Sequence, residues 1–151
     1  MRSPPGVSSA REVFESIRKT VRVFADPQGR ELFDLPRAPR PDEDADVPVR
    51  YLPEYDNLLL AFDDRQRVIA TAHRKYVITR NLIIPATFLV DGMVAGTWKL
   101  EKKKREARLV LTPFAPLARP ARQALLAEGE RLRAFLEPAL SGIVDIAAPL
   151  S

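Results

Sequence analysis

The chain has 151 residues, of which 46% are hydrophobic, so it is long enough to bury a sizeable core as a globular protein. It contains no cysteine, which excludes disulfides and thiolate metal sites. Lysine and arginine total 24 against 20 aspartate and glutamate, and the net charge of +4 permits polyanion binding without requiring it. The sequence has neither an apolar secretion-signal core at its start nor a run of about 18 apolar residues. We therefore expect a cytoplasmic protein that does not enter the membrane.

Residues 8–35 predict a helix followed by a β-hairpin. Apolar side chains recur at helical spacing over residues 9–19. Two alternating strands, 20–25 and 30–35, then flank a turn at 26–29 whose proline and glycine favour a chain reversal. A helix followed by a hairpin is the second half of a winged-helix module, so we expect a partial winged helix here.

Residues 36–48, PRAPRPDEDADVP, predict a linker between two domains. The segment is acidic, and its prolines interrupt both helices and central strands. We expect the second domain to cover residues 49–140.

The second domain begins with an apolar run in YLPEYDNLLLAF, residues 51–62, which predicts a mostly buried strand. Asp63 or Asp64 can then cap a short helix that reaches His73. A strand through Val68 fits the same segment, and the sequence leaves both alternatives open.

Residues 85–100, PATFLVDGMVAGTWKL, predict a tight hairpin. Asp91 and Gly92 supply the two positive φ angles of a two-residue type I′ turn. This turn places Gly96 opposite Thr87, where two backbones approach closely. The expected faces are Phe88, Ala95 and Thr97 on one side and Leu89, Val94, Trp98 and Leu100 on the other. Because neither face is polar, we expect the hairpin to be covered on both sides, inside a closed barrel or beneath a helix.

The remaining pattern predicts a third antiparallel strand and a closing helix. Residues 105–112 alternate apolar and polar side chains, and an amphipathic helix runs from Pro120 to Leu136. The expected fold class is therefore α+β, with a partial winged helix followed by a small antiparallel β-barrel-like domain that a C-terminal helix closes.

These motifs resemble the C-terminal half of bacterial winged-helix DNA-binding proteins related to the interstrand-crosslink DNA glycosylases. The resemblance extends from about Arg11 to Leu136, and its most specific part is the LVDG…GTW signature. The residues that carry it are Leu52, Pro53, Tyr55, Asp56, Asp63 or Asp64, Arg65, His73, Pro85, Thr87, Leu89, Val90, Asp91, Gly92, Gly96, Thr97, Trp98, Pro113, Phe114, Glu128, Leu132, Phe135 and Leu136.

The resemblance implies winged-helix repeats followed by a small β-barrel, both lying along duplex DNA, with DNA repair as the role. Full members resemble enzymes that cut the N-glycosidic bond of an alkylated nucleotide, with a Gln-x-Gln pair positioning a water. This sequence has only Gln28, Gln66 and Gln123, and none has a glutamine two residues away. No catalytic residue carries over, so we expect a truncated or split member without glycosylase activity of its own, and no cofactor.

Two other residues are weaker candidates for chemistry. Asp56 lies beside Tyr55 and apolar neighbours that could raise its pKa, but an aspartate in such a position more often caps backbone amides. His73 is flanked by cations and could touch phosphate, or it could simply be solvated. It has no second histidine or cysteine with which to bind a metal.

Exposed cations in two regions are the candidates for DNA binding. They are Arg18, Lys19, Arg22 and Arg30 at the helix end and early hairpin, and Lys102, Lys103, Lys104 and Arg105 in the loop between two late strands. Such a loop can reach one phosphate backbone, although a charged turn also prevents edge pairing between sheets. Trp98 could stack on a base, but an aromatic ring in an apolar hairpin usually packs in the core.

Two functions remain compatible with the sequence. One is nonspecific binding of duplex DNA through phosphate contacts. The other is a protein-interaction module, in which the apolar surface around Val13, Ile17 and Phe24 completes a separately encoded winged-helix partner or pairs with another copy.

Overall fold

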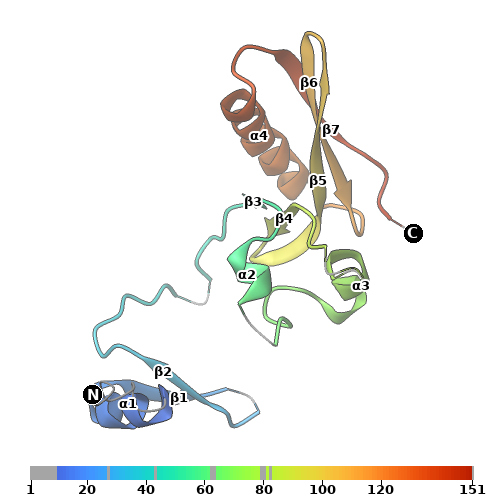
Figure 1. Cartoon of the computed structure of the whole chain (residues 1–151). Coiled ribbons are helices and arrows are strands. Elements are labelled where there is room, and N and C mark those ends of the chain that lie inside the picture. The colour runs from blue at the N-terminus through green and yellow to red at the C-terminus, as the bar shows by residue number, and fades with distance from the viewer. Residues whose placement is uncertain are drawn as a thin grey trace, which may run out of the picture. The chain divides into compact units, whose positions relative to one another are not determined.

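The computed structural model describes residues 10–26, 28–42, 44–61, 64–78, 81 and 83–150 (Figure 1). The chain divides into two compact units, Met1–Ala45 and Asp46–Ser151. Helices and two separate sheets make up these units, so the predicted α+β class is confirmed.

The first unit is a short helix followed by a two-stranded hairpin. Its elements are α1 (Ala10–Ile17), η1 (Arg18–Thr20), β1 (Arg22–Ala25) and β2 (Glu31–Asp34). The helix contacts the hairpin through an edge-to-face pair of Phe14 and Phe33, whose ring centroids are 4.5 Å apart. The predicted order of helix and hairpin is confirmed.

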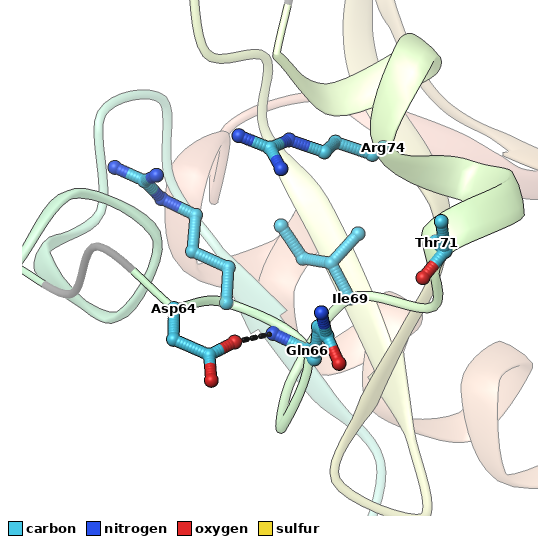
Figure 2. Close-up of a pocket in the computed structure, with 6 residues that line it drawn as sticks. Asp64, Gln66, Ile69, Thr71 and Arg74 are labelled. Carbon is cyan, nitrogen blue, oxygen red and sulfur yellow. Dashed lines mark hydrogen bonds between the residues drawn. The ribbon is translucent and has the colours of Figure 1, made fainter.

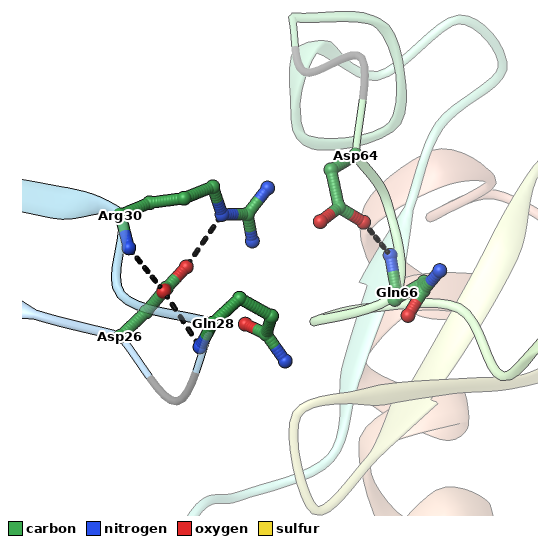
Figure 3. Close-up of polar contacts among 5 residues, drawn as sticks. All are labelled: Asp26, Gln28, Arg30, Asp64 and Gln66. Atoms are coloured by element: carbon green, nitrogen blue, oxygen red, sulfur yellow. Dashed lines mark hydrogen bonds and ion pairs between the residues drawn. The ribbon is translucent and has the colours of Figure 1, made fainter.

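The hairpin turn is organised by Asp26. Its carboxylate accepts hydrogen bonds from the backbone N–H groups of Gln28 (2.9 Å) and Arg30 (2.8 Å), and Gly29 has the positive φ of 77° that the turn requires (Figure 3). Pro27, which the sequence also assigns to this turn, lies outside the described residues. The described part of residues 36–48 forms neither helix nor strand.

The second unit is built on one five-stranded sheet. Its elements are β3 (Arg50–Leu52), α2 (Asn57–Leu60), η2 (Thr71–His73), α3 (Arg74–Val77), β4 (Thr87–Val90), β5 (Met93–Lys103), β6 (Glu106–Pro113), α4 (Arg119–Leu136) and β7 (Ser141–Ile146). The strand order is β3-β4-β5-β6-β7, and all neighbours are antiparallel except β6 and β7, which are parallel.

The predicted β-barrel is wrong, because this sheet is open. Among the described residues β3 and β7 are its two edges and do not pair with each other. The sheet is also mixed, because the chain returns through α4 and adds β7 parallel to β6, beyond the end of the predicted 105–112 strand and 120–136 helix.

The β4–β5 hairpin has the predicted turn but a different register. Asp91 and Gly92 both have positive φ, 50° and 74°. A bulge then leaves Ala95 unpaired, so Gly96 lies opposite Phe88 and not opposite Thr87. The bulge shifts the following residues by one position, and the predicted faces are therefore wrong beyond Ala95. Trp98 packs on the side of Phe88 and donates its indole N–H to the Leu52 carbonyl at 2.9 Å.

The sheet is covered on both faces, as its apolar pattern predicts. Phe88 and Leu89, consecutive on β4, belong to different clusters because successive side chains of a strand point to opposite faces. The buried members of one cluster are Leu59, Ile69, Val77, Ile84, Leu89, Val94 and Phe114. Those of the other are Val49, Phe88, Leu109, Leu111 and Leu125, the last from α4. The helix α4 lies close to the sheet at Gly129, where a Cβ atom would come within 2.8 Å of the Tyr51 hydroxyl.

Two sequence predictions before this hairpin are wrong. The apolar run after Tyr55 forms the short helix α2, not a strand, because the Asp56 side chain caps it by accepting a hydrogen bond from the Leu58 N–H at 2.8 Å. The sequence leaves the next segment open between a helix that reaches His73 and a strand through Val68, and its described part forms neither: it makes a turn after Asp64 and then η2. None of the described helices is both long enough and apolar enough to cross a membrane.

Candidate nucleic-acid interface

The tip of the β5–β6 hairpin carries a run of four cationic side chains. Lys102 and Lys103 end β5, and Lys104 and Arg105 form the two-residue turn before β6. All four are exposed. The Arg105 carbonyl accepts a hydrogen bond from the Ser141 hydroxyl at 3.1 Å, which ties the tip to the start of β7. The tip is thus a cationic protrusion supported by three strands.

The four cations of the tip differ in their partners. The ammonium group of Lys102 pairs with the carboxylate of Glu137, which follows α4. Over the described part of the chain, no acidic side chain forms an ion pair with Lys103, Lys104 or Arg105. We call these last three residues the hairpin-tip cations. Their charges are available to an external anion.

The predicted cations of the first unit are more often occupied by acidic neighbours. The Arg18 guanidinium donates to Glu31 at 2.5 Å, and this hydrogen bond raises the pKa of Arg18 above its usual range. Arg30 donates its Nε–H to the Asp26 carboxylate at 2.6 Å (Figure 3). Both charges are therefore largely balanced within the protein.

Asp26 keeps its negative charge despite partial desolvation. Desolvation raises the pKa of its carboxyl group, but the hydrogen bonds from Arg30 and Gln28 outweigh it and bring the pKa below its usual value. The Arg30 side chain consequently faces a permanent anion at neutral pH.

The two other predicted cations of this unit, Lys19 and Arg22, are exposed and form no ion pair with any described residue. Arg22 lies over the Phe24 ring, 5.5 Å from its centroid. Of the eight predicted DNA-binding residues, four lie in each unit, and Arg18, Arg30 and Lys102 are the three held in ion pairs.

The predicted DNA-binding set leaves out two arginines that line a cavity in the second unit, Arg65, which carries part of the family resemblance, and Arg74, one of the cations beside His73. The cavity has a volume of about 290 Å³. Its lining residues are Asp64, Arg65, Gln66, Ile69, Thr71 and Arg74 (Figure 2). The segment DDRQR shows the first arginine as one charge among several, but the folding of residues 64–74 that brings it near Arg74 leaves no periodic signal.

The candidates for acid chemistry, phosphate contact and base stacking, Asp56, His73 and Trp98, make structural contacts. The Asp56 side chain is the cap of α2. The His73 ring is half-buried and packs against Phe114, with centroids 5.2 Å apart. Trp98 packs into the sheet. No group of three metal-binding side chains occurs among the described residues.

Comparisons with known proteins place this scaffold in a family of DNA-acting proteins. Residues 6–135 match the family described as DNA glycosylase AlkZ-like, so the chain belongs to that family. The resemblance stated from the sequence is confirmed. No curated protein gives a significant match to this chain.

A solved structure also matches this chain, that of the DNA glycosylase AlkZ of Streptomyces sahachiroi. The identity is 26%, the TM-score is 0.67, and the match covers 94% of this chain. It covers 38% of the Streptomyces protein, so the chain spans well under half the length of that relative.

Proposed function

We propose that this chain binds duplex DNA nonspecifically and that the hairpin-tip cations contact the phosphate backbone. The observation that carries the proposal is a cluster of three exposed cations at the tip of the β5–β6 hairpin that form no ion pair with any acidic side chain in the described part of the chain. Nonspecific DNA binding comes almost entirely from such cation–phosphate contacts and the counterions they release. Membership in a DNA glycosylase family makes duplex DNA the expected polyanion, and the cytoplasm of a bacterium is where such a protein would meet it.

Within this proposal the first unit acts as a partial winged helix. Lys19 and Arg22 lie at the helix end and on the first strand of the hairpin, where a wing would contact phosphates or the minor groove. Arg18 and Arg30 contribute less, because Glu31 and Asp26 balance their charges.

We also propose that the chain does not hydrolyse a glycosidic bond by itself. Glycosidic hydrolysis needs a group that positions or activates water. The Gln-x-Gln pair implied by the family resemblance is absent from the sequence, and Asp56 is committed to capping. Incubation with alkylated duplex DNA should release no base, whereas release above a no-protein control would contradict this proposal.

Fluorescence anisotropy with a labelled duplex tests DNA binding directly. The binding constant should fall with salt by about 0.9 logarithmic unit per logarithmic unit of salt for each neutralised phosphate. Because the three hairpin-tip cations give three phosphate contacts, we expect the logarithm of the binding constant to fall with the logarithm of the salt concentration with a slope of about −2.7 or steeper. Negligible binding at low salt would refute the proposal.

A second function is favoured by the apolar surface of the first unit. Val13 and Ile17 on α1 are 45% and 43% exposed, and Phe24 is 38% exposed. Several exposed apolar side chains on one small unit could together form an interaction surface. The partner would be a separately encoded winged-helix protein or a second copy. Sedimentation across a concentration series tests self-association, and a Val13→Lys variant should abolish any dimer.

A further inference from the structure

The cavity lined by Arg65 and Arg74 lies apart from the hairpin tip and has the chemistry of an anion site. Two guanidinium groups, the Thr71 hydroxyl and the Gln66 amide all offer hydrogen-bond donors at its edge. Guanidinium groups match phosphate oxygens in pairs, which makes arginine the preferred residue for phosphate recognition. The volume of about 290 Å³ is at the lower end for small-molecule sites, so it suits a phosphate group better than a whole nucleotide.

The backbone that carries these donors is held firmly by the sheet. The Asp64 carboxylate accepts the Gln66 N–H at 3.0 Å (Figure 2). The Arg65 carbonyl accepts the Ile69 N–H at 2.8 Å. The Val68 carbonyl accepts the Val94 N–H of β5 at 2.8 Å. This loop is therefore a defined turn tied to the sheet, which fixes the backbone positions from which the donor side chains extend.

The two arginines are positioned differently. Arg65 is half-buried and donates its Nε–H to the Leu59 carbonyl at 2.5 Å, which fixes its guanidinium beside the cavity. Arg74 is exposed on α3, whose Val77 is fully buried, so its backbone is anchored while its side chain extends beside Ile69 (Figure 2). No described acidic residue forms an ion pair with Arg74.

Asp64 is the one anion in the lining, and its charge opposes an incoming phosphate. Because it accepts a backbone N–H within its own turn, it also holds the loop in shape. Two guanidinium groups line the cavity together with this one carboxylate.

We propose that Arg65 and Arg74 form a phosphate-binding site, with Thr71 and Gln66 as neutral donors. The inference rests on the proposed function in one respect, since that function identifies the phosphate as one of the DNA backbone. The site would then hold a phosphate in addition to those at the hairpin tip.

The test compares Arg74→Gln with Arg122→Gln. Both remove one exposed arginine that has no described ion-pair partner, but Arg122 lies on α4, which packs on the opposite face of the sheet. Wild-type protein and both variants are titrated with labelled duplex over a salt series. We expect the Arg74 variant to reduce the slope by about 0.9 and the Arg122 variant to leave it unchanged. An unchanged slope for the Arg74 variant, or equal reductions in both, would overturn the inference while DNA binding itself stands.

A second measurement tests whether the site binds phosphate independently of whether the protein binds DNA. Amide ¹H–¹⁵N spectra of the full chain are recorded with sodium phosphate and with sodium chloride at equal ionic strength. Phosphate should shift the amide signals of Gln66, Thr71 and Arg74, and the Arg74→Gln variant should lose these shifts. If the wild type shows these amide shifts but does not bind DNA, the proposed function is refuted, and the site binds the phosphate of another ligand. If it shows neither, the site is refuted.

Discussion

At the scale of single residues, Asp56 illustrates how one carboxylate can suggest chemistry and serve structure. Its side chain accepts the Leu58 N–H and so satisfies one free donor at the start of α2. Replacing Asp56 by alanine should destabilise the protein by about 1 kcal/mol. Asparagine can make the same cap and should restore most of that loss in urea unfolding. A loss as large for asparagine as for alanine would show that the negative charge has a different role.

Gly96 is required by a close approach within the sheet. A Cβ atom there would lie 2.3 Å from the Phe88 ring and 2.5 Å from the Thr112 carbonyl oxygen. Gly96→Ala should therefore lower the free energy of unfolding by about 1–3 kcal/mol, because a packed core resists added volume. When Phe88 is also changed to leucine, the loss in free energy of unfolding caused by Gly96→Ala should become smaller, because the smaller side chain leaves room for the added Cβ. If the losses caused by the two changes are strictly additive, the packing explanation is wrong.

Tyr51 links stability to alkaline pH. Burial, and then the charge of Glu128, raise the pKa of its phenol well above the ordinary 10.0, and the hydroxyl donates to the Leu125 carbonyl at 2.8 Å. Since the folded pKa exceeds the unfolded one, this contribution is complete below pH 10 and is lost as the pH rises above it. Tyr51→Phe should cost about 1 kcal/mol at pH 7, and the difference from the wild type should narrow above pH 10. A difference that stays constant to pH 11 would contradict the assignment.

At the scale of elements, features that depend on neighbouring residues could be predicted from the sequence, whereas features that depend on contacts between distant residues could not. The β4–β5 turn depends on Asp91 and Gly92 alone, so the sequence shows it directly. The bulge at Ala95 depends on how Phe88 fits against Gly96, which no periodicity reveals. The parallel edge strand β7 was missed because it pairs with β6 across the whole of α4, a non-local contact that leaves no local pattern in the sequence.

The helix α2 was missed for a different reason. Its three leucines form a continuous apolar run that fits a buried strand as well as a helix. The deciding residue is Asp56, because a capping side chain just before an apolar run indicates the start of a helix.

The ion pair between Lys102 and Glu137 connects two elements that the sequence separates widely. Glu137→Gln should release the Lys102 ammonium and, if the hairpin tip contacts DNA, steepen the salt slope of binding by up to about 0.9. Glu128→Gln, which removes the partner of Arg131 on α4, is the matched control. A slope that changes equally in both variants would mean that overall charge, and not the hairpin tip, determines binding.

At the scale of the whole molecule, the candidate site was predictable only in part. The sequence identifies Lys103, Lys104 and Arg105 because they are consecutive in a loop between two strands. It cannot show that Arg18, Arg30 and Lys102 are paired, since these contacts depend on tertiary packing or turn geometry. Nor can it show the cavity of Arg65 and Arg74, whose lining comes from a loop and a helix.

The two units present different surfaces to possible partners. The second buries a double-sided sheet core and carries the hairpin-tip cations. The first has a small aromatic contact and leaves most of its apolar strand and helix residues exposed. DNA binding is therefore expected to depend mainly on the second unit, and protein association on the first.

In the proposed function, the hairpin-tip cations provide the main contact with duplex DNA. The most direct test is the salt slope of duplex binding for a variant with Lys103, Lys104 and Arg105 all changed to glutamine. The control changes Arg119, Arg122 and Arg131 of α4 to glutamine, which removes the same charge elsewhere. We predict that the hairpin-tip variant loses up to about 2.7 of the slope while the control keeps it. If the hairpin-tip variant keeps the wild-type slope and affinity, these three cations are not the main contact with duplex DNA.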